Sequence, residues 1–74
     1  MQRIHVESKA MASAGYDPET LCLEIEFRDG TIYQYRDVPP DLWSALLRSE
    51  SKGHFLNAEI RGRFAHKIIP VVIT

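Results

Sequence analysis

The segment Thr31–Asp37, with the sequence Thr-Ile-Tyr-Gln-Tyr-Arg-Asp, constrains the fold more than any other part of this chain. Its two tyrosines are two residues apart, so in a β-strand both side chains point to the same face of the sheet. The turn signal Asp29-Gly30 precedes the segment, and the helix-start signal Val38-Pro39-Pro40-Asp41 follows it. Strand pairing before the segment and helix packing after it therefore both depend on where it lies.

The stretch before the turn has the clearest strand pattern in the sequence. Its polar positions include Cys22, Glu24 and Glu26. The apolar residues that alternate with them are Leu21, Leu23, Ile25 and Phe27. This alternation is typical of a strand with one buried face.

The loop between these two strands decides which residues lie opposite each other. A two-residue loop, Asp29-Gly30, would place the tyrosines among the glutamates. A three-residue loop, Arg28-Asp29-Gly30, instead places Tyr33 opposite Ile25, so the tyrosines join the apolar face. Gly30 then takes the left-handed position of a type I turn followed by a G1 bulge, which favours glycine. We predict the three-residue loop.

Shorter signals indicate the other elements. Small, weakly alternating residues over 8–16 predict a first strand that ends near Tyr16, and Asp17-Pro18-Glu19-Thr20 predicts the turn after it. Pro40 and Asp41 suit the first turn of a helix that ends near Ser49. The apolar face of this helix is expected to comprise Leu42, Trp43, Leu46 and Leu47, with Val38 as a hydrophobic staple against Trp43.

A shorter second helix is expected to follow. Ser51 is its candidate N-cap and Gly62 its stop. Its apolar face comprises Phe55, Leu56 and Ile60, with Phe64 continuing the line. The tail after it, residues 67–74, is β-branched and apolar, and can form an edge strand in which Pro70 is tolerated.

These elements predict an α+β fold. We expect a three-stranded antiparallel meander, with the tail as a fourth, C-terminal edge strand, and two helices packed on one face. With 74 residues, the chain is a single domain near the lower size limit for a hydrophobic core. Domains of this size often need a disulfide, a metal or a partner subunit.

The sequence restricts which of these supports the chain can use. Cys22 is the single cysteine, which excludes an internal disulfide and fits a reducing compartment. His5, His54 and His66 are too scattered for a zinc site. Of the three kinds of support, homo-oligomerisation is therefore the one that remains. Neither a signal peptide nor a membrane span is visible, and we expect a cytoplasmic protein with no membrane partner.

A series of short motifs runs along most of the chain in a fixed order: Gly15-Tyr16-Asp17, Leu23-x-Ile25-x-Phe27, Asp29-Gly30, Tyr33-x-Tyr35, Val38-Pro39 and Ser51-x-Gly53-x-Phe55-x-Asn57-x-x-Ile60-Arg61. Through these motifs the chain resembles, from Ser8 to about Ile68, a KTSC domain, a small module named after the C-terminus of some lysyl-tRNA synthetases. On this interpretation residues 1–74 form one KTSC-like domain, with residues 69–74 as an apolar tail. The resemblance implies a binding module, and the synthetase context suggests RNA as its partner.

The distribution of charge points to the C-terminal part of the chain. Residues 1–47 have a formal charge of −4 and residues 48–74 a formal charge of +3. A basic segment in a neutral protein can present a basic face, although ordinary surface solvation also explains it. The candidate nucleic-acid-binding residues are Lys52, His54, Asn57, Arg61, Arg63 and Lys67. The arginines and Lys67 could instead pair with Glu24 and Glu26.

The two motif tyrosines, Tyr33 and Tyr35, could serve as a platform on which bases stack. Their predicted register favours a place in the core instead, with the hydroxyl groups at the rim. The serines Ser44, Ser49 and Ser51 lack a His–acid pattern, and no basic residue adjoins Cys22 in the sequence. We therefore expect no enzyme and no cofactor.

Two functions remain in view. The first is a non-catalytic binding module for RNA. The alternative is a module that binds another protein chain through its sheet edge and apolar tail.

Overall fold

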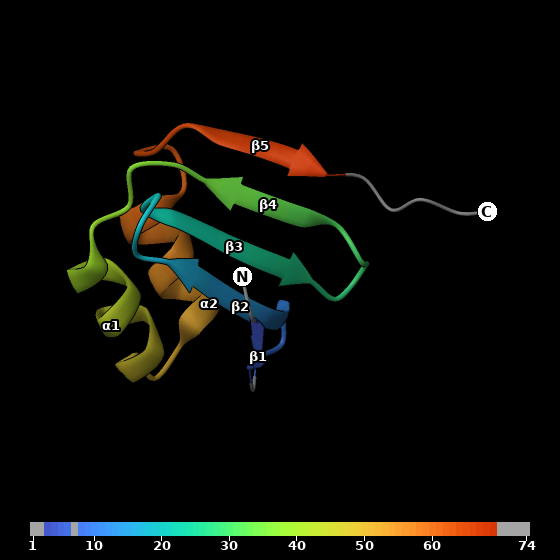
Figure 1. The fold of residues 1–74 in the computed structure, drawn as a ribbon. Helices are drawn as coiled ribbons and strands as arrows, with labels where there is room; N and C mark the ends of the chain where they lie inside the picture. The colour runs from blue at the N-terminus through green and yellow to red at the C-terminus, as the bar shows by residue number, and fades with distance from the viewer. Residues whose placement is uncertain (1–2, 7, 70–74) are drawn as a thin grey trace.

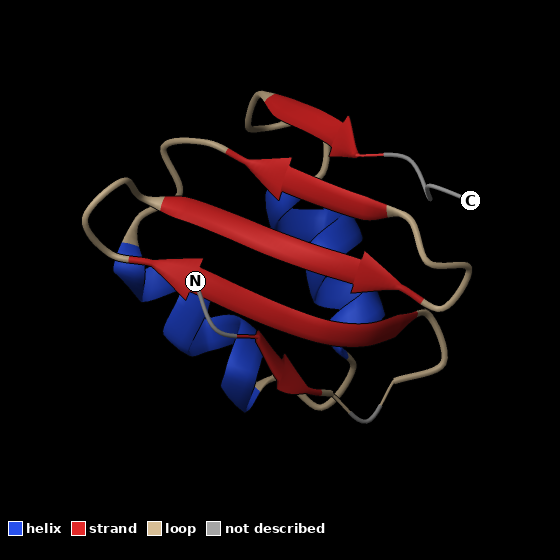
Figure 2. Cartoon of the chain, turned by 45° about the vertical axis from the view of Figure 1, so that its right-hand side comes forward, coloured by secondary structure: helices blue, strands red, loops and turns tan. Residues whose placement is uncertain are grey.

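The computed structural model describes residues 3–6 and 8–69, and their elements form two layers (Figures 1 and 2). One layer is an antiparallel sheet with the strand order β1-β2-β3-β4-β5, and the other consists of helices that cover one face of the sheet. The strands are β1 (Arg3–His5), β2 (Met11–Asp17), β3 (Cys22–Phe27), β4 (Ile32–Tyr35) and β5 (His66–Ile69). The helices are α1 (Pro40–Arg48) and α2 (Lys52–Phe55), and α2 continues into the π-helical segment η1 (Leu56–Ile60).

This architecture confirms the α+β class, the antiparallel meander and the edge strand near the C-terminus. The tail beyond Ile69, including Pro70, lies outside the described residues. Strand β1 was not predicted, because it has only three residues, too few to give a strand pattern, and all three are exposed. The predicted strand over 8–16 begins only at Met11, because the Ser8 hydroxyl accepts the N–H groups of Ala10 and Met11 in a tight turn.

The β3–β4 hairpin has the predicted three-residue loop. Leu23 lies opposite Tyr35, and Ile25 lies opposite Tyr33. The N–H of Gly30 donates to the carbonyl of Phe27 at 2.9 Å, and Gly30 has a φ of 92°. The glycine therefore occupies the left-handed position that the turn requires.

Two leucines do not lie where the sequence pattern places them. Leu21 was expected on the apolar face of the second strand, but its φ is 58° and the strand begins at Cys22. Leu47 was expected on the buried face of α1, but it is 36% exposed, whereas Leu46 is 1% exposed. Each helical residue is rotated by about 100° from the one before, so Leu47 lies beyond the edge of the face that Leu46 centres.

The second helix begins as predicted and then changes its geometry. The Ser51 hydroxyl accepts the N–H of His54 at 3.4 Å, which is the predicted N-cap. Farther on, the N–H of Arg61 donates to the carbonyl of Leu56, five residues back, at 2.8 Å. This π turn holds one more residue than an α turn, and Gly62, with a φ of 82°, follows it.

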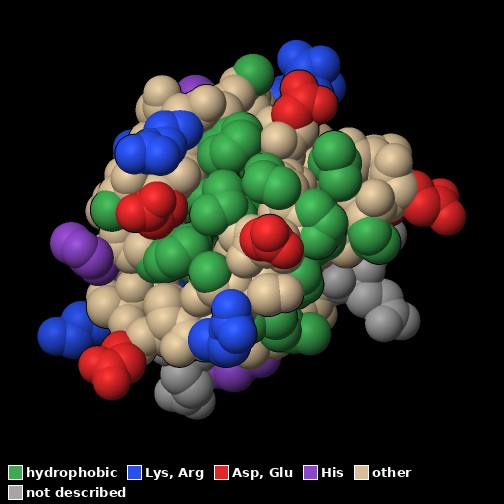
Figure 3. Space-filling view, turned by 90° about the vertical axis from the view of Figure 1, so that its left-hand side faces the viewer, with side chains coloured by type: hydrophobic (Ala, Val, Ile, Leu, Met, Phe, Trp, Pro, Cys, Tyr) green, Lys and Arg blue, Asp and Glu red, His purple; other side chains and the backbone are tan. Residues whose placement is uncertain are grey.

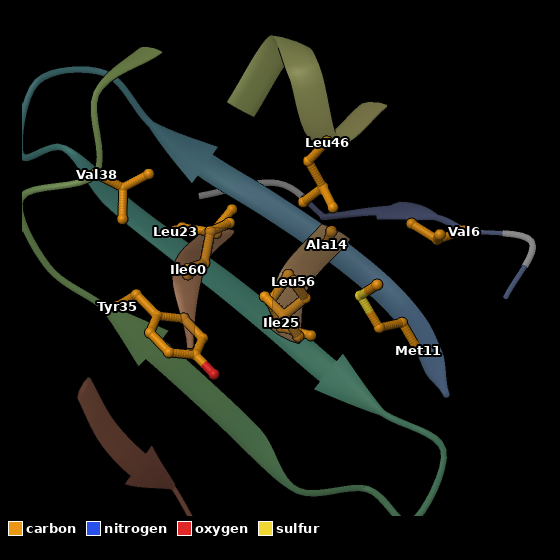
Figure 4. Close-up of a cluster of buried hydrophobic side chains, with 10 residues drawn as sticks. All are labelled: Val6, Met11, Ala14, Leu23, Ile25, Tyr35, Val38, Leu46, Leu56 and Ile60. Carbon is orange, nitrogen blue, oxygen red and sulfur yellow. The ribbon is translucent and has the colours of Figure 1, made fainter. Parts of the chain in front are cut away.

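The core lies between the sheet and the helices (Figure 4). The side chain of Tyr35 is fully buried there, and that of Val38 enters from the β4–α1 connection. The tyrosine hydroxyl of Tyr16 donates to the carbonyl of Val38, and its ring stacks on Trp43 at 5.8 Å. The other buried members of the core are Val6, Met11, Ala14, Leu23, Ile25, Leu46, Leu56 and Ile60.

Candidate nucleic-acid interface

The strand register assigns the polar side chains to the face of the sheet that the helices leave open. One cross-strand row comprises Arg3, Gly15, Glu24, Gln34 and Lys67. In this row the Arg3 guanidinium lies 3.5 Å from the Glu24 carboxylate, which also accepts a hydrogen bond from Gln34 at 2.9 Å. Lys67 is thus on the opposite face of the sheet from the helices.

The acidic residues of β3 do not pair with Arg61, Arg63 or Lys67. Glu24 is bound by Arg3 and Gln34, and Glu26 accepts a hydrogen bond from the Ser13 hydroxyl at 2.8 Å. The suggested pairing of Arg61, Arg63 or Lys67 with these glutamates was therefore wrong. The glutamates are satisfied within the sheet, on the face away from the helices.

Lys67 lines a shallow hollow of about 490 Å³ on the open face. Its other lining residues are Thr20, Cys22, Gln34 and Arg36. Burial raises the pKa of the Cys22 thiol, and the carboxylates of Glu24 and Asp17 raise it further against the opposing effect of Arg36. The thiol is therefore held in its protonated, weakly nucleophilic form.

Two adjoining hollows lie elsewhere, on either side of Ala10 and Arg28. The first, which we call the Lys52 hollow, has a volume of about 780 Å³, and its walls include Lys9, Ser51, Lys52 and Gly53. The second, the Tyr33 hollow, has a volume of about 290 Å³, and its walls include Phe27, Asp29, Thr31, Tyr33 and Arg61. Because Ala10 and Arg28 line both, the two hollows are neighbours and together form one candidate site.

Four cationic side chains surround this site: Lys9, Arg28, Lys52 and Arg61. We call this set the basic rim. Glu50 and Asp29 are the acidic residues on the same walls. The rim therefore has an excess of positive charge in a protein whose formal net charge is −1.

Neutral oxygen atoms hold three of the rim cations in place. The Arg28 guanidinium donates twice to the carbonyl of Ser8, at 2.8 and 2.5 Å. Arg61 donates to the side-chain oxygen of Asn57 at 3.3 Å, and Lys52 donates to the carbonyl of Ser49 at 3.1 Å. Within residues 3–6 and 8–69, the ion pair found is that of Arg3 with Glu24, so no rim cation forms an ion pair with a carboxylate of these residues.

The structure brings together part of the predicted set of binding residues. Lys52 and Arg61 line adjoining hollows, although an unbroken α-helix would turn them to opposite sides. The wider π turn between them changes their relative rotation. Asn57 holds Arg61, whereas His54 and Arg63 line neither hollow.

Lys67, another member of the predicted set, lines the hollow on the open face of the sheet and neither of the two hollows that Lys52 and Arg61 line. Sequence reasoning also missed Lys9 and Arg28. Arg28 directly precedes Asp29-Gly30, and this position was interpreted only as part of a turn.

The two motif tyrosines have different environments. The ring of Tyr35 lies in the core, as predicted, but its hydroxyl does not reach the rim. The whole side chain is buried, and within the described part of the chain the hydroxyl has no hydrogen-bond partner. Burial raises the pKa of Tyr35, while the positive charge of Arg61 acts in the opposite direction. Tyr33 is only partly buried and lines its hollow, with its ring 5.1 Å from that of Phe27 and 5.5 Å from that of His66.

Gly53, in the wall of the Lys52 hollow, is not required by packing. A Cβ atom at this position would lie 3.7 Å from the Cβ of Ala10, which is an ordinary contact. Close packing therefore does not account for this glycine. A glycine leaves the backbone accessible to a ligand.

The side of the molecule on which α1 lies has a different character (Figure 3). Apolar side chains gather across the middle of this face, and acidic and basic side chains are scattered among and around them. Leu47 contributes to the exposed apolar surface of α1. Positive charge is thus not concentrated on this face.

The described residues also limit other kinds of site. None of their helices has the length and hydrophobicity of a membrane-spanning segment. They bring together no group of three His, Cys, Asp or Glu side chains that could hold a metal ion.

Comparison with known proteins assigns the chain to a family. The solved KTSC domain protein of Yersinia pestis superposes with a TM-score of 0.90 at 39% identity, over 93% of this chain and 97% of that one. An uncharacterized protein of Stutzerimonas stutzeri is 44% identical over 57 residues, which cover 77% of this chain and 80% of the relative. A lysine–tRNA ligase of Nostoc punctiforme is 36% identical over 58 residues, which are 78% of this chain but 10% of the ligase. The KTSC domain model matches residues 7–64, and the chain belongs to the KTSC domain family.

Proposed function

We propose that this small KTSC domain is a binding module for RNA and that the basic rim contacts the phosphate backbone. The observation that carries the proposal is the set of four rim cations, none of which forms an ion pair with a carboxylate of the described residues. Phosphate contacts by Lys and Arg position a nucleic acid and supply much of its affinity. The anchored guanidinium groups of Arg28 and Arg61 need little further ordering to make such contacts.

Two further features support an RNA ligand. The accessible backbone at Gly53 lets a phosphate approach the wall of the Lys52 hollow. In addition, a relative in which a similar segment occurs is named lysine–tRNA ligase, and this name refers to an RNA. This relationship favours RNA over other polyanions.

The salt dependence of binding tests the proposal. Fluorescence anisotropy with a labelled single-stranded RNA oligonucleotide gives the dissociation constant at several salt concentrations. Four phosphate contacts predict a slope of log K against log salt of about −2.8, because each contact to a single strand contributes about −0.7. The double variant Lys52→Gln with Arg61→Gln should make this slope shallower by about 1.4.

The chain offers a matched control with the same change in charge. Arg63 and Lys67 line neither of the two hollows, so Arg63→Gln with Lys67→Gln should leave the slope unchanged. Equal slopes in both double variants would show that the rim does not contact the backbone. Absence of RNA binding by the unmodified protein at low salt would also refute the proposal.

A second candidate function rests on strand β5. This strand pairs with β4 on one side and is the last strand in the order of the sheet, and its Ile68 is 47% exposed. An edge of this kind can add a strand from another protein chain, including a second copy of this one. Such binding would depend little on salt, so the same titration separates the two functions.

A further inference from the structure

We infer that the RNA segment is unpaired and that one of its bases enters the Tyr33 hollow. This inference rests on the proposed function and specifies the class of RNA that the site takes. It follows from three properties of the hollow: its aromatic wall, its size and the arrangement of charge around it.

Aromatic rings form part of the wall. The rings of Phe27 and Tyr33 lie 5.1 Å apart and nearly perpendicular, at 80°. The ring of Tyr33 is further supported by those of His66, at 5.5 Å, and Tyr35, at 6.1 Å. Tyr33 is therefore held in place by its neighbours while part of it lines the hollow. A fixed aromatic surface of this kind suits the face of any base.

The size of the hollow restricts what can enter. Its volume of about 290 Å³ is at the lower end of the range of roughly 300–1,000 Å³ for ligand pockets. This volume accommodates one base, whereas a base pair within a helix would have to remain outside. Bases in a duplex are stacked on their neighbours, so entry requires a single strand, a loop or a bulge.

The charges place the base and the phosphates in different parts of the site. The Asp29 carboxylate lines the Tyr33 hollow, and its hydrogen bond from the Thr31 N–H, at 2.9 Å, favours the ionised form. A phosphate is repelled from such a position, but an uncharged base is not. Arg28 and Arg61 lie on the walls of the same hollow, so they can hold the phosphates on either side of the base.

Base insertion can be detected with the unmodified protein. The probe is a short single-stranded RNA in which 2-aminopurine, a fluorescent base, replaces each base in turn. Stacking on an aromatic ring quenches its fluorescence. We expect quenching at one or more positions that saturates together with the anisotropy of the labelled strand. We also expect weaker binding to a duplex of the same sequence by at least tenfold.

The variant Tyr33→Leu tests the contribution of the ring. Its apolar side chain retains much of the packing, so the variant should fold, as a thermal melt would show. Loss of one stacked base predicts about 5- to 150-fold weaker binding to the single strand, with an unchanged salt slope. The matched control is Tyr16→Leu, because Tyr16 stacks on Trp43 and lines neither hollow. This control should bind the single strand as the unmodified protein does.

The outcomes separate this inference from the proposed function. Equal affinity for the single strand and the duplex, without quenching, would overturn base insertion. If the salt slope still depended on the rim residues in that case, the proposal of RNA binding would stand. If the unmodified protein does not bind RNA at low salt, both fall. The quenching measurement decides the question even if Tyr33→Leu does not fold.

Discussion

The backbone N–H of Val38 donates a hydrogen bond to the carbonyl of Leu21 at 2.9 Å, and on each side of this bond one residue has an unusual backbone conformation. Leu21 has a φ of 58°, and Asp37, directly before Val38, has a φ of 62°. Non-glycine residues rarely adopt such values, and a bulky residue such as Leu does so only when its surroundings impose it. The bond closes the end of the β3–β4 hairpin and directs the Val38 side chain into the core.

Asp37→Gly should relieve the strain at this closure. Asp37 is exposed, so its side chain contributes little packing. Glycine avoids the steric cost of a positive φ, about 1–2 kcal/mol, but adds about 0.5–1 kcal/mol of conformational freedom to the unfolded chain, so we expect a net increase in the free energy of unfolding of up to about 1 kcal/mol. Asp37→Val should decrease it, because a β-branched residue disfavours this conformation. Urea denaturation of both variants checks the pair, and equal effects would contradict it.

The β3–β4 loop is the second place where backbone geometry determines the fold. Gly30→Val should lower the free energy of unfolding by at least about 1–2 kcal/mol, because Val would have to adopt the φ of 92°. Gly53→Ala is a useful contrast, since Gly53 is helical and has space for a Cβ atom. That variant should be stabilised by about 0.5–1 kcal/mol. A neutral result for Gly30→Val in thermal melts would show that the loop does not have this form.

Sequence reasoning found the hairpin register and the starts of the two helices because each depends on local chemistry. Gly30 satisfies a left-handed position, and Ser51 accepts an N–H group of the turn that follows it. The positive φ of Leu21 could not be predicted, because it depends on the hydrogen bond that its carbonyl accepts from Val38, a residue distant in sequence. The short strand β1 could not be predicted either, since pairing with β2 rather than its own residues stabilises it.

The candidate site was predicted only in part, for a similar reason. Lys52 and Arg61 were found because they belong to a basic segment. Lys9 and Arg28 come from an acidic part of the chain. They join the rim because β2 pairs with β3, and the hydrogen bond from the Arg28 N–H to the carbonyl of Ala10, at 3.1 Å, extends this pairing to the residues beside them. Lys67 was included in the predicted set because it belongs to the same basic segment, but strand pairing places it on the other face of the sheet.

The buried hydroxyl of Tyr35 leads to a prediction about two substitutions. Within the described residues this hydroxyl has no hydrogen-bond partner, so Tyr35→Phe removes an unsatisfied buried group. The free energy of unfolding should be unchanged or increase by up to about 1 kcal/mol. Tyr35→Ala removes the ring from the core and should lower it by about 3–5 kcal/mol. A clear loss of stability in Tyr35→Phe, measured by denaturant titration, would reveal a partner for the hydroxyl.

Alkaline pH provides a separate test of the same side chain. Burial raises the pKa of Tyr35 in the folded protein above its ordinary value of 10.0. Between these two pKa values the unfolded chain gives up the proton while the folded protein retains it, so the free energy of unfolding falls as the pH rises above about 10. Tyr35→Phe should reduce this fall, leaving the parts due to Tyr16 and Cys22, whose pKa values burial also raises. An identical pH dependence in the variant would contradict this assignment.

Cys22 should react slowly with thiol reagents. Its pKa is raised above 9.0 by burial and by the carboxylates of Glu24 and Asp17, so little thiolate is present near pH 8.5. The rate of reaction with a disulfide reagent should therefore be lower in the folded protein than in the same chain unfolded by urea. Equal rates in the two states would show that the thiol is neither buried nor repelled by its acidic neighbours.

His66 and Lys67 are neighbours on strand β5, but they should respond differently to the same substitution. His66 is exposed to solvent, yet its ring lies 5.5 Å from that of Tyr33 and 5.8 Å from that of Tyr35. Lys67 extends from the other face of the strand. His66→Thr should lower the free energy of unfolding by about 0.5–1.5 kcal/mol, which is the contribution of an aromatic contact. Lys67→Thr should change it by less than about 0.5 kcal/mol. Threonine suits a strand at both positions, so the difference reports the ring contacts alone, and equal losses in urea denaturation would show that His66 does not support the tyrosines.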